Sequence, residues 1–121
     1  MRAVAASARS RSAGVSAVDA AALKTLAKQA GEAAQLLKLL GNEKRLLILC
    51  FLVARGEMTV GELVEVVKLS QSALSQHLAL LRGDGLVTFR RTSQTLHYSV
   101  ADKRALRVLQ VLKEIYCGNL K

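Results

Sequence analysis

Between residues 59 and 100 the chain carries a capped helix, a tight turn, a second capped helix and a basic hairpin, in that order. Thr59 opens the first helical pattern and is followed three residues later by Glu62, the spacing of a capping box. Ser70 stands at the cap position of the next predicted helix, Gln71 to about Arg82. This order constrains the fold more than any other feature, because it predicts a helix-turn-helix followed by a β-wing.

The residues after the second of these helices favour two short strands and a last helix. Leu86 to Arg91 and Thr95 to Val100 are the predicted strands, with Thr92-Ser93-Gln94 at the tip of the hairpin. Asp102 is the predicted cap of a last helix that ends near Cys117.

The residues before the helix-turn-helix predict two further helices and a tail. Residues 1–17 are rich in Ala, Ser and Arg, so we expect a disordered tail, and residues 18–121 form the single predicted domain. An apolar stripe from Asp19 to Leu40 predicts one helix, and Glu43 to Ala54 predicts a second. The second is apolar almost all round, which is typical of a central, buried helix. The predicted fold is mainly α with a small β-hairpin, in the order α-α-α-α-β-β-α.

Composition and charge narrow the class of partner. The chain has 121 residues and a formal net charge of +9, with 3% aromatic residues, so its core must be built from Leu, Val and Ala. An excess of positive charge favours a polyanion, either a nucleic acid or an anionic membrane surface. The longest apolar run, Leu46 to Ala54, is too short to span a membrane. We expect a cytoplasmic protein with reduced cysteines and no membrane partner.

The helix that opens at Ser70 has two contrasting sides. Three leucines fall on one side and are predicted to pack inward: Leu74, Leu78 and Leu81. Four polar residues fall on the opposite side: Gln71, Ser72, Ser75 and Gln76. Short donors and acceptors of this kind read base edges or hold phosphates, although a solvated polar face has the same composition. His77 borders the leucine side, where we expect a local hydrogen bond or a phosphate contact.

The predicted wing supplies the context that favours DNA over a merely solvated face. Arg90 and Arg91 stand beside its tip and are predicted to meet phosphates or the minor groove. A polar reading helix followed by a basic wing therefore predicts binding to double-stranded DNA.

Several stretches carry a family resemblance. The segment LSQSALSQHLALLRGDGLV with its short basic wing resembles the ArsR/SmtB family of winged-helix repressors. GNEKRLLILC, VGELVEVVKLSQSALSQHLALLRGDGLV and the closing IYC are similar to the HlyU, BigR and SqrR branch, so that the resemblance covers Ala33 to Cys117. It implies a homodimer joined through the first and last helices, an imperfect inverted repeat as operator, and usually repression of transcription. The apolar stripes of the terminal helices agree with a dimer.

Metal sensing is common in that family, but the residues here do not favour it. The place where metal-sensing members often carry Cys-x-Cys is occupied by Thr59-Val60-Gly61, and the last helix contains no histidine. The two cysteines and two histidines of the chain do not have zinc-site spacing, so we expect no metal and no cofactor. A metal-responsive repressor remains a lesser alternative.

The two cysteines, Cys50 and Cys117, lie in the second predicted helix and at the end of the last one. The residues alone favour a functional role for these cysteines no more than a structural one, in which both are small hydrophobic side chains of the core. The resemblance implies instead a redox switch: the two thiols react with persulfides or polysulfides, become linked by a sulfur bridge within one subunit, and release DNA. The apolar surroundings expected for Cys50 should raise the pKa of its thiol.

Two other classes of protein are alternatives to this sensor. A HlyU-like antisilencer or activator with inert cysteines would share every DNA-binding feature. A thiol oxidoreductase would need a Cys-x-x-Cys motif or a nearby acid–base pair, and the sequence has neither. We therefore do not expect an enzyme.

Overall fold

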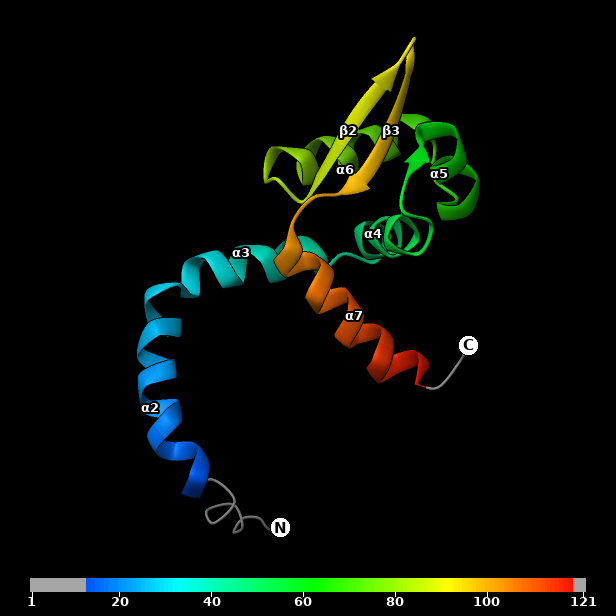
Figure 1. Ribbon diagram of the computed structural model, residues 1–121. Helices are drawn as coiled ribbons and strands as arrows, with labels where there is room; N and C mark the ends of the chain where they lie inside the picture. Colours follow the sequence, from blue (N-terminus) through cyan, green and yellow to red (C-terminus); the bar gives the residue numbers. More distant parts are fainter. Residues whose placement is uncertain (1–12, 119–121) are drawn as a thin grey trace. The chain divides into compact units, whose positions relative to one another are not determined.

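The computed structural model describes residues 13–118, which form helices together with one small antiparallel sheet (Figure 1). In chain order the elements are α2 (Ala13–Lys28), α3 (Ala30–Leu40), α4 (Glu43–Arg55), β1 (Met58–Thr59), α5 (Val60–Val67), α6 (Gln71–Gly83), β2 (Val87–Thr92), β3 (Thr95–Val100) and α7 (Lys103–Cys117). The chain divides into two compact units, with the boundary between Leu36 and Leu37. The second unit holds α4 to α7 and the sheet, and it confirms the predicted winged helix-turn-helix.

The helices before α4 differ from the predicted ones in their boundaries. The single helix expected from Asp19 to Leu40 is interrupted at Gln29, whose N–H donates to the carbonyl of Leu26 at 3.0 Å. Helix α2 begins at Ala13, inside the stretch for which the sequence predicted a tail. Residues 1–12 of that predicted tail lie outside the described residues.

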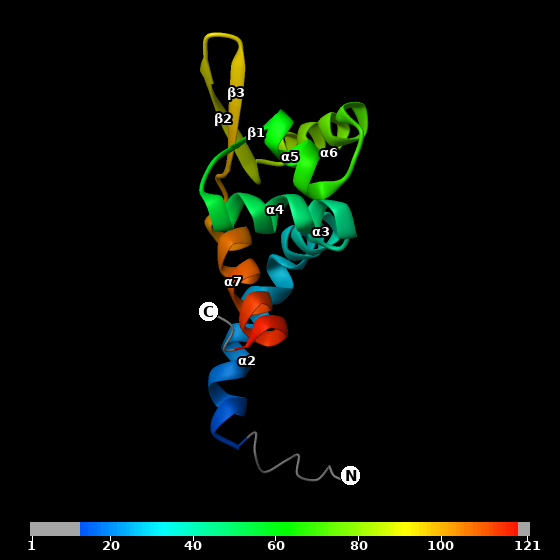
Figure 2. The same cartoon turned by 90° about the vertical axis from the view of Figure 1, so that its right-hand side faces the viewer.

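The core of the second unit is built where α4, α5 and α6 meet, and Figure 2 shows α4 crossing beneath the other two. The side chains that fill it are at most 1% exposed and are almost all aliphatic: Ile48, Leu49, Leu52, Leu63, Val67, Leu74, Leu78 and Leu81. Truncating one such leucine to alanine typically costs about 2–5 kcal/mol. This packing fixes the position of α6 relative to α4 and α5.

The predicted caps set the two ends of the helix-turn-helix. The Thr59 hydroxyl accepts from the Glu62 N–H at 3.2 Å, and the Glu62 carboxylate accepts from the Thr59 N–H at 2.9 Å, so the capping box is confirmed. Lys68 ends α5 with a left-handed backbone, φ 64°. Ser70 then accepts from the Ala73 N–H at 3.1 Å and starts α6, as predicted.

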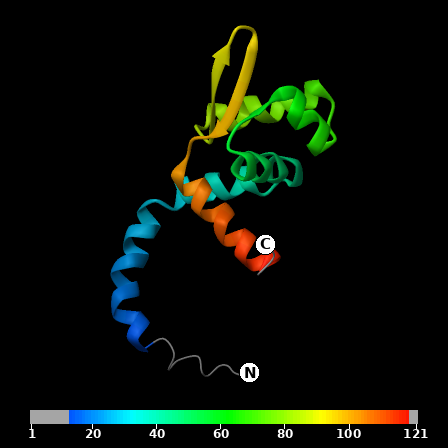
Figure 3. The ribbon, with the colours of Figure 1, turned by 45° about the vertical axis from the view of Figure 1, so that its right-hand side comes forward.

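The sheet has one more strand than the sequence predicted. Its order is β1-β3-β2, antiparallel throughout, with Met58 paired to Tyr98 and Phe89 paired to Tyr98 from the other side. Strand β1 has only two residues, too short for an alternating pattern to be visible. The tip is a two-residue turn, in which Ser93 has a positive φ of 55°. The hairpin projects past the helices as a wing (Figure 3).

Helix α4 is less buried than its composition predicted. Ile48, Leu49 and Leu52 are buried, but Cys50 and Ala54 are exposed. The remaining apolar side chains of α4 are half-buried: Leu46, Leu47, Phe51 and Val53. The helix is central, since it packs against α5, β3 and α7, but it is only partly buried.

Candidate DNA-binding surface and thiol pair

Helix α6 presents a polar surface that its own leucines orient. Leu74, Leu78 and Leu81 are buried, and this turns the opposite side of the helix to solvent. The four residues predicted to read DNA are all exposed on that side: Gln71, Ser72, Ser75 and Gln76. The exposed side continues into Ala79 and Leu80, and Leu80 is 46% exposed. Neither residue was among those predicted to face DNA. The accessible strip is therefore polar in the first half of α6, continues through Ala79 and Leu80, and ends at the exposed Arg82.

His77 lies half-buried at the edge of this strip. Burial lowers the pKa of its imidazole below the ordinary value, and the positive charge of Arg45 lowers it further. The ring is therefore neutral at neutral pH. Any contact that His77 makes with a phosphate would be a hydrogen bond rather than an ion pair.

The two wing arginines have different surroundings. Arg90 donates from Nε to one carboxylate oxygen of Glu57 at 2.7 Å and from Nη2 to the other at 2.9 Å. This pair lowers the pKa of Glu57 and raises the pKa of Arg90. Arg91 is exposed next to it on β2. The sequence pattern does not distinguish the two arginines and gives no sign of Glu57 as a partner, because Glu57 lies 33 residues earlier in the chain.

Both cysteines are free thiols at the surface of this chain. Cys50 lies on the exposed side of α4, and Cys117 is the last residue of α7. Cys50 is exposed, but its sulfur is partly shielded from solvent; this desolvation raises the pKa of the thiol, and the charge of Cys117 raises it further. The direction expected for Cys50 is confirmed, although its side chain is exposed rather than buried. The second cause means that the two thiols lie within electrostatic range of each other.

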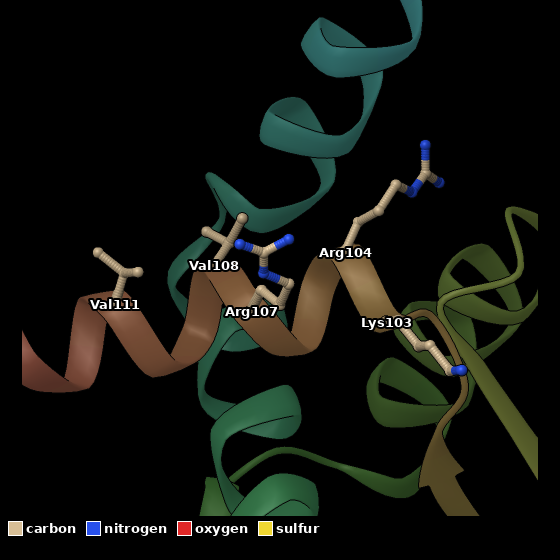
Figure 4. Close-up of a pocket in the computed structure, with 5 residues that line it drawn as sticks. All are labelled: Lys103, Arg104, Arg107, Val108 and Val111. Carbon is tan, nitrogen blue, oxygen red and sulfur yellow. The ribbon is translucent and has the colours of Figure 1, made fainter.

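Helix α7 carries a shallow depression that is basic at one end and apolar at the other (Figure 4). Its lining residues are Lys103, Arg104, Arg107, Val108 and Val111. Arg104 donates to Asp102 at 2.7 Å, where Asp102 also caps the helix as predicted. Beyond the depression, Ile115 and Tyr116 are 64% and 82% exposed. The stripe predicted for α7 is thus buried only in part.

Metal binding and membrane insertion are two further features that the described residues address. Among residues 13–118, no group of three or more His, Cys, Asp or Glu side chains is placed to hold a metal ion. No helix in that described part of the chain is both long and apolar enough to cross a membrane.

Comparison with known proteins gives a consistent result. The family model described as "Bacterial regulatory protein, arsR family" matches residues 42–88, which run from the cap of α4 to the start of β2. The chain is 45% identical over 95 residues to the transcriptional activator HlyU of Vibrio cholerae, covering 78% of this chain and 87% of HlyU.

A second relative and a solved structure extend the match. The chain is 40% identical over 96 residues to the biofilm growth-associated repressor of Agrobacterium fabrum, covering 79% of this chain and 81% of the repressor. The structure of reduced HlyU from Vibrio cholerae superposes with a TM-score of 0.73 at 45% identity, covering 78% of this chain and 98% of that one. Relatives and structure agree with the helix-turn-helix and wing described above, and the chain belongs to the ArsR family of bacterial transcription regulators.

Proposed function

We propose that this protein is a homodimeric, DNA-binding transcription repressor whose hold on its operator is released when persulfides or polysulfides bridge Cys50 and Cys117. The observation that supports the switch is that both thiols are free and exposed, and that the charge of Cys117 contributes to raising the pKa of Cys50 although the two residues lie far apart in the sequence. As a regulator that acts on a bacterial chromosome, the protein would work in the cytoplasm.

The DNA-binding half of the proposal rests on α6 and the wing. The exposed polar residues of α6 are the kinds that read base edges in the major groove, and the wing carries exposed arginines. A two-fold dimer would place two such helices about one turn of DNA apart. We therefore expect the operator to be an imperfect inverted repeat in double-stranded DNA.

The dimer is supported by apolar side chains that this chain leaves uncovered. Helix α2 exposes Leu23 and Leu26, and α7 exposes Val111, Ile115 and Tyr116. Large apolar side chains grouped on one helix are typical of an interface. We assign them to contacts with a second copy of this chain. The family resemblance implies a dimer joined through the first and last helices, which are the helices that expose these side chains.

The proposed chemistry is two successive thiol–disulfide exchanges. One cysteine thiolate attacks a sulfur–sulfur bond of a polysulfide, which forms a Cys–S–S bond and expels the remaining sulfur chain with the bonding electron pair. The second thiolate then attacks the sulfur chain attached to the first cysteine and expels hydrosulfide. The two thiols together lose two electrons, the sulfane sulfur gains them, and the thiol protons leave with solvent or sulfide.

The position of the thiols gives the bridge a route to the DNA. Cys50 belongs to α4, which packs directly against α5 and β3, whereas Cys117 ends α7. A covalent link would restrain α7 relative to α4 and so change the geometry of an interface that uses α7. A coupling free energy of about 1–3 kcal/mol between two such sites is ordinary.

The test combines intact-protein mass spectrometry with fluorescence anisotropy on a short duplex selected by the wild-type protein from a random-sequence library. Polysulfide should add sulfur between the cysteines of one subunit and weaken binding, while Cys50→Ser and Cys117→Ser proteins stay bound. A Ser10→Ala protein, altered in neither thiol, is the matched control and should respond like the wild type. Release of DNA by the Cys117→Ser protein, or a link between subunits, would exclude the switch.

A second candidate function differs in the direction of regulation. The relative HlyU is named an activator, whereas the Agrobacterium relative is named a repressor. An activator or antisilencer with inert cysteines would bind the same DNA and ignore polysulfide. A transcription assay on a promoter that carries the selected duplex distinguishes the two, since a repressor lowers and an activator raises the transcript.

A further inference from the structure

The wing sheet has two faces of opposite character, and neighbouring arginines fall on different ones. Side chains alternate along a strand, so Val87, Phe89 and Arg91 share one face while Arg90 lies on the other. The face of Arg91 also carries Met58 and Tyr98, which are buried. Figure 2 shows α5 and α6 on one side of the sheet, and the burial of these residues identifies it as the face of Arg91.

The opposite face is polar and holds Arg90. The register places Arg90 opposite His97, and His97 opposite Thr59 of β1. Glu57 lies two residues before Thr59, which puts its side chain on this same face. His97 contributes to lowering the pKa of Glu57, and it is hydrogen-bonded to Thr92 at 2.8 Å. These groups form one polar cluster on the face away from α6.

The Glu57–Arg90 pair ties the wing to the body of the domain. Glu57 stands between α4 and β1, and its carboxylate holds Arg90 through two hydrogen bonds of 2.7 and 2.9 Å. Beyond β1 the wing is a bare two-stranded hairpin, an arrangement that has little stability by itself. A bidentate arginine–carboxylate pair at this point fixes the direction in which the hairpin leaves the sheet.

We propose that the two arginines divide the work of the wing: Arg90 is a positioning residue held by Glu57, and Arg91 is the residue that contacts the phosphate backbone. The proposal rests on DNA binding by the wing and α6, but not on the thiol switch. It replaces the expectation that both arginines contact DNA. Glu57 becomes part of the DNA-binding machinery although it carries the charge that DNA repels.

Neutralising Glu57 should change the affinity for DNA in opposite directions, depending on whether Arg90 positions the wing or contacts phosphate. If Arg90 is a positioning residue, Glu57→Gln should weaken binding to the selected duplex by about fivefold, the effect of losing a well-formed surface ion pair. If Arg90 instead contacts phosphate, Glu57→Gln would free it and tighten binding. Tighter or unchanged binding by this variant therefore overturns the proposal.

The salt dependence of binding supplies a readout that a change in stability does not move. Arg91→Ala should lower the slope of log affinity against log salt by about one unit, because one phosphate contact is lost. Arg90→Ala should weaken binding while keeping the wild-type slope. A slope that falls by about one unit in Arg90→Ala overturns the assignment.

A charge swap separates the specific pair from a general charge effect. Arg90→Glu should bind poorly, and the double variant Glu57→Arg/Arg90→Glu should recover most of the affinity because the pair is rebuilt in reverse. The matched control is Glu57→Arg/Arg91→Glu, which restores the same net charge without a pair and should stay weak. Equal recovery in both double variants, or in neither, overturns the proposal. Thermal unfolding of each variant confirms that it is folded.

All these binding measurements use reduced protein without polysulfide. They therefore test the roles of Arg90 and Arg91 even if the thiol switch does not exist. Failure of the wild-type protein to bind any duplex would overturn this inference together with the DNA-binding half of the proposed function.

Discussion

The guanidinium of Arg82 lies 4.3 Å from the centre of the Phe89 ring, and this contact joins the last turn of α6 to the first strand of the wing. Phe89 also meets Tyr98 edge-on, with ring centres 5.4 Å apart. The helix that presents the polar strip and the hairpin that carries Arg91 are therefore held together by one aromatic side chain.

Replacing Phe89 with leucine should destabilise the protein by about 1–2 kcal/mol, because a cation–π contact and an aromatic pair are lost while apolar volume is kept. Urea unfolding followed by circular dichroism measures this change. Phe51→Leu is the matched control, since the Phe51 ring meets Arg55 at the longer distance of 5.6 Å within α4. Equal losses in the two variants would show that the Arg82–Phe89 contact adds nothing special.

Ser75→Ala and Gln76→Ala should each weaken binding to the selected duplex by about 1–3 kcal/mol if the side chain contacts a base. The expected loss is larger on that duplex than on a scrambled one, because base contacts carry sequence information. Gln110→Ala, an exposed position on α7, is the control and should bind normally. Wild-type affinity in alanine variants of all four polar residues, Gln71 and Ser72 included, would exclude α6 as the reading helix.

Alkylation of Cys50 by iodoacetamide should accelerate only above the pH at which an ordinary thiol ionises, because burial and then the Cys117 thiolate raise the pKa of Cys50. Removing the second cause with Cys117→Ser should move the rate profile of Cys50 to lower pH. The shift should be incomplete, since burial, the larger cause, remains. A profile that does not move on this substitution would place the two thiols out of electrostatic range.

Asp102→Ala should cost about 0.5–2 kcal/mol of stability at neutral pH, the usual effect of removing a helix N-cap. The side-chain hydrogen bond from Arg104, aided by the backbone N–H groups of Ala105 and Arg104, lowers the pKa of Asp102. A lowered folded-state pKa means that the stabilisation is complete above the unfolded-state pKa and disappears as pH falls through the folded-state value.

The difference between wild type and Asp102→Ala should therefore shrink on acidification. Chemical unfolding at a series of pH values measures it, with Glu65→Ala, an exposed acidic position on α5, as control. A difference that persists unchanged in acid would mean that the carboxylate charge is not what holds the cap.

The amino-acid sequence by itself determined the helix-turn-helix, because its signals act over three or four residues. Thr59 and Glu62 cap α5, and Ser70 caps α6, through groups that are neighbours in the chain. The spacing of the leucines in α6 likewise determined which side of that helix is exposed, since a helix repeats every 3.6 residues. These local rules are the same in any tertiary setting.

The tertiary structure decided what depends on distant partners. Strand β1 exists because β3 pairs with it, and Glu57 holds Arg90 because the sheet brings residues 33 apart in sequence onto one face. Cys50 is exposed although the apolar composition of α4 predicted a buried helix, because α5, β3 and α7 leave part of that helix uncovered. Such outcomes follow from which surfaces meet, and no pattern within a single helix or strand records that.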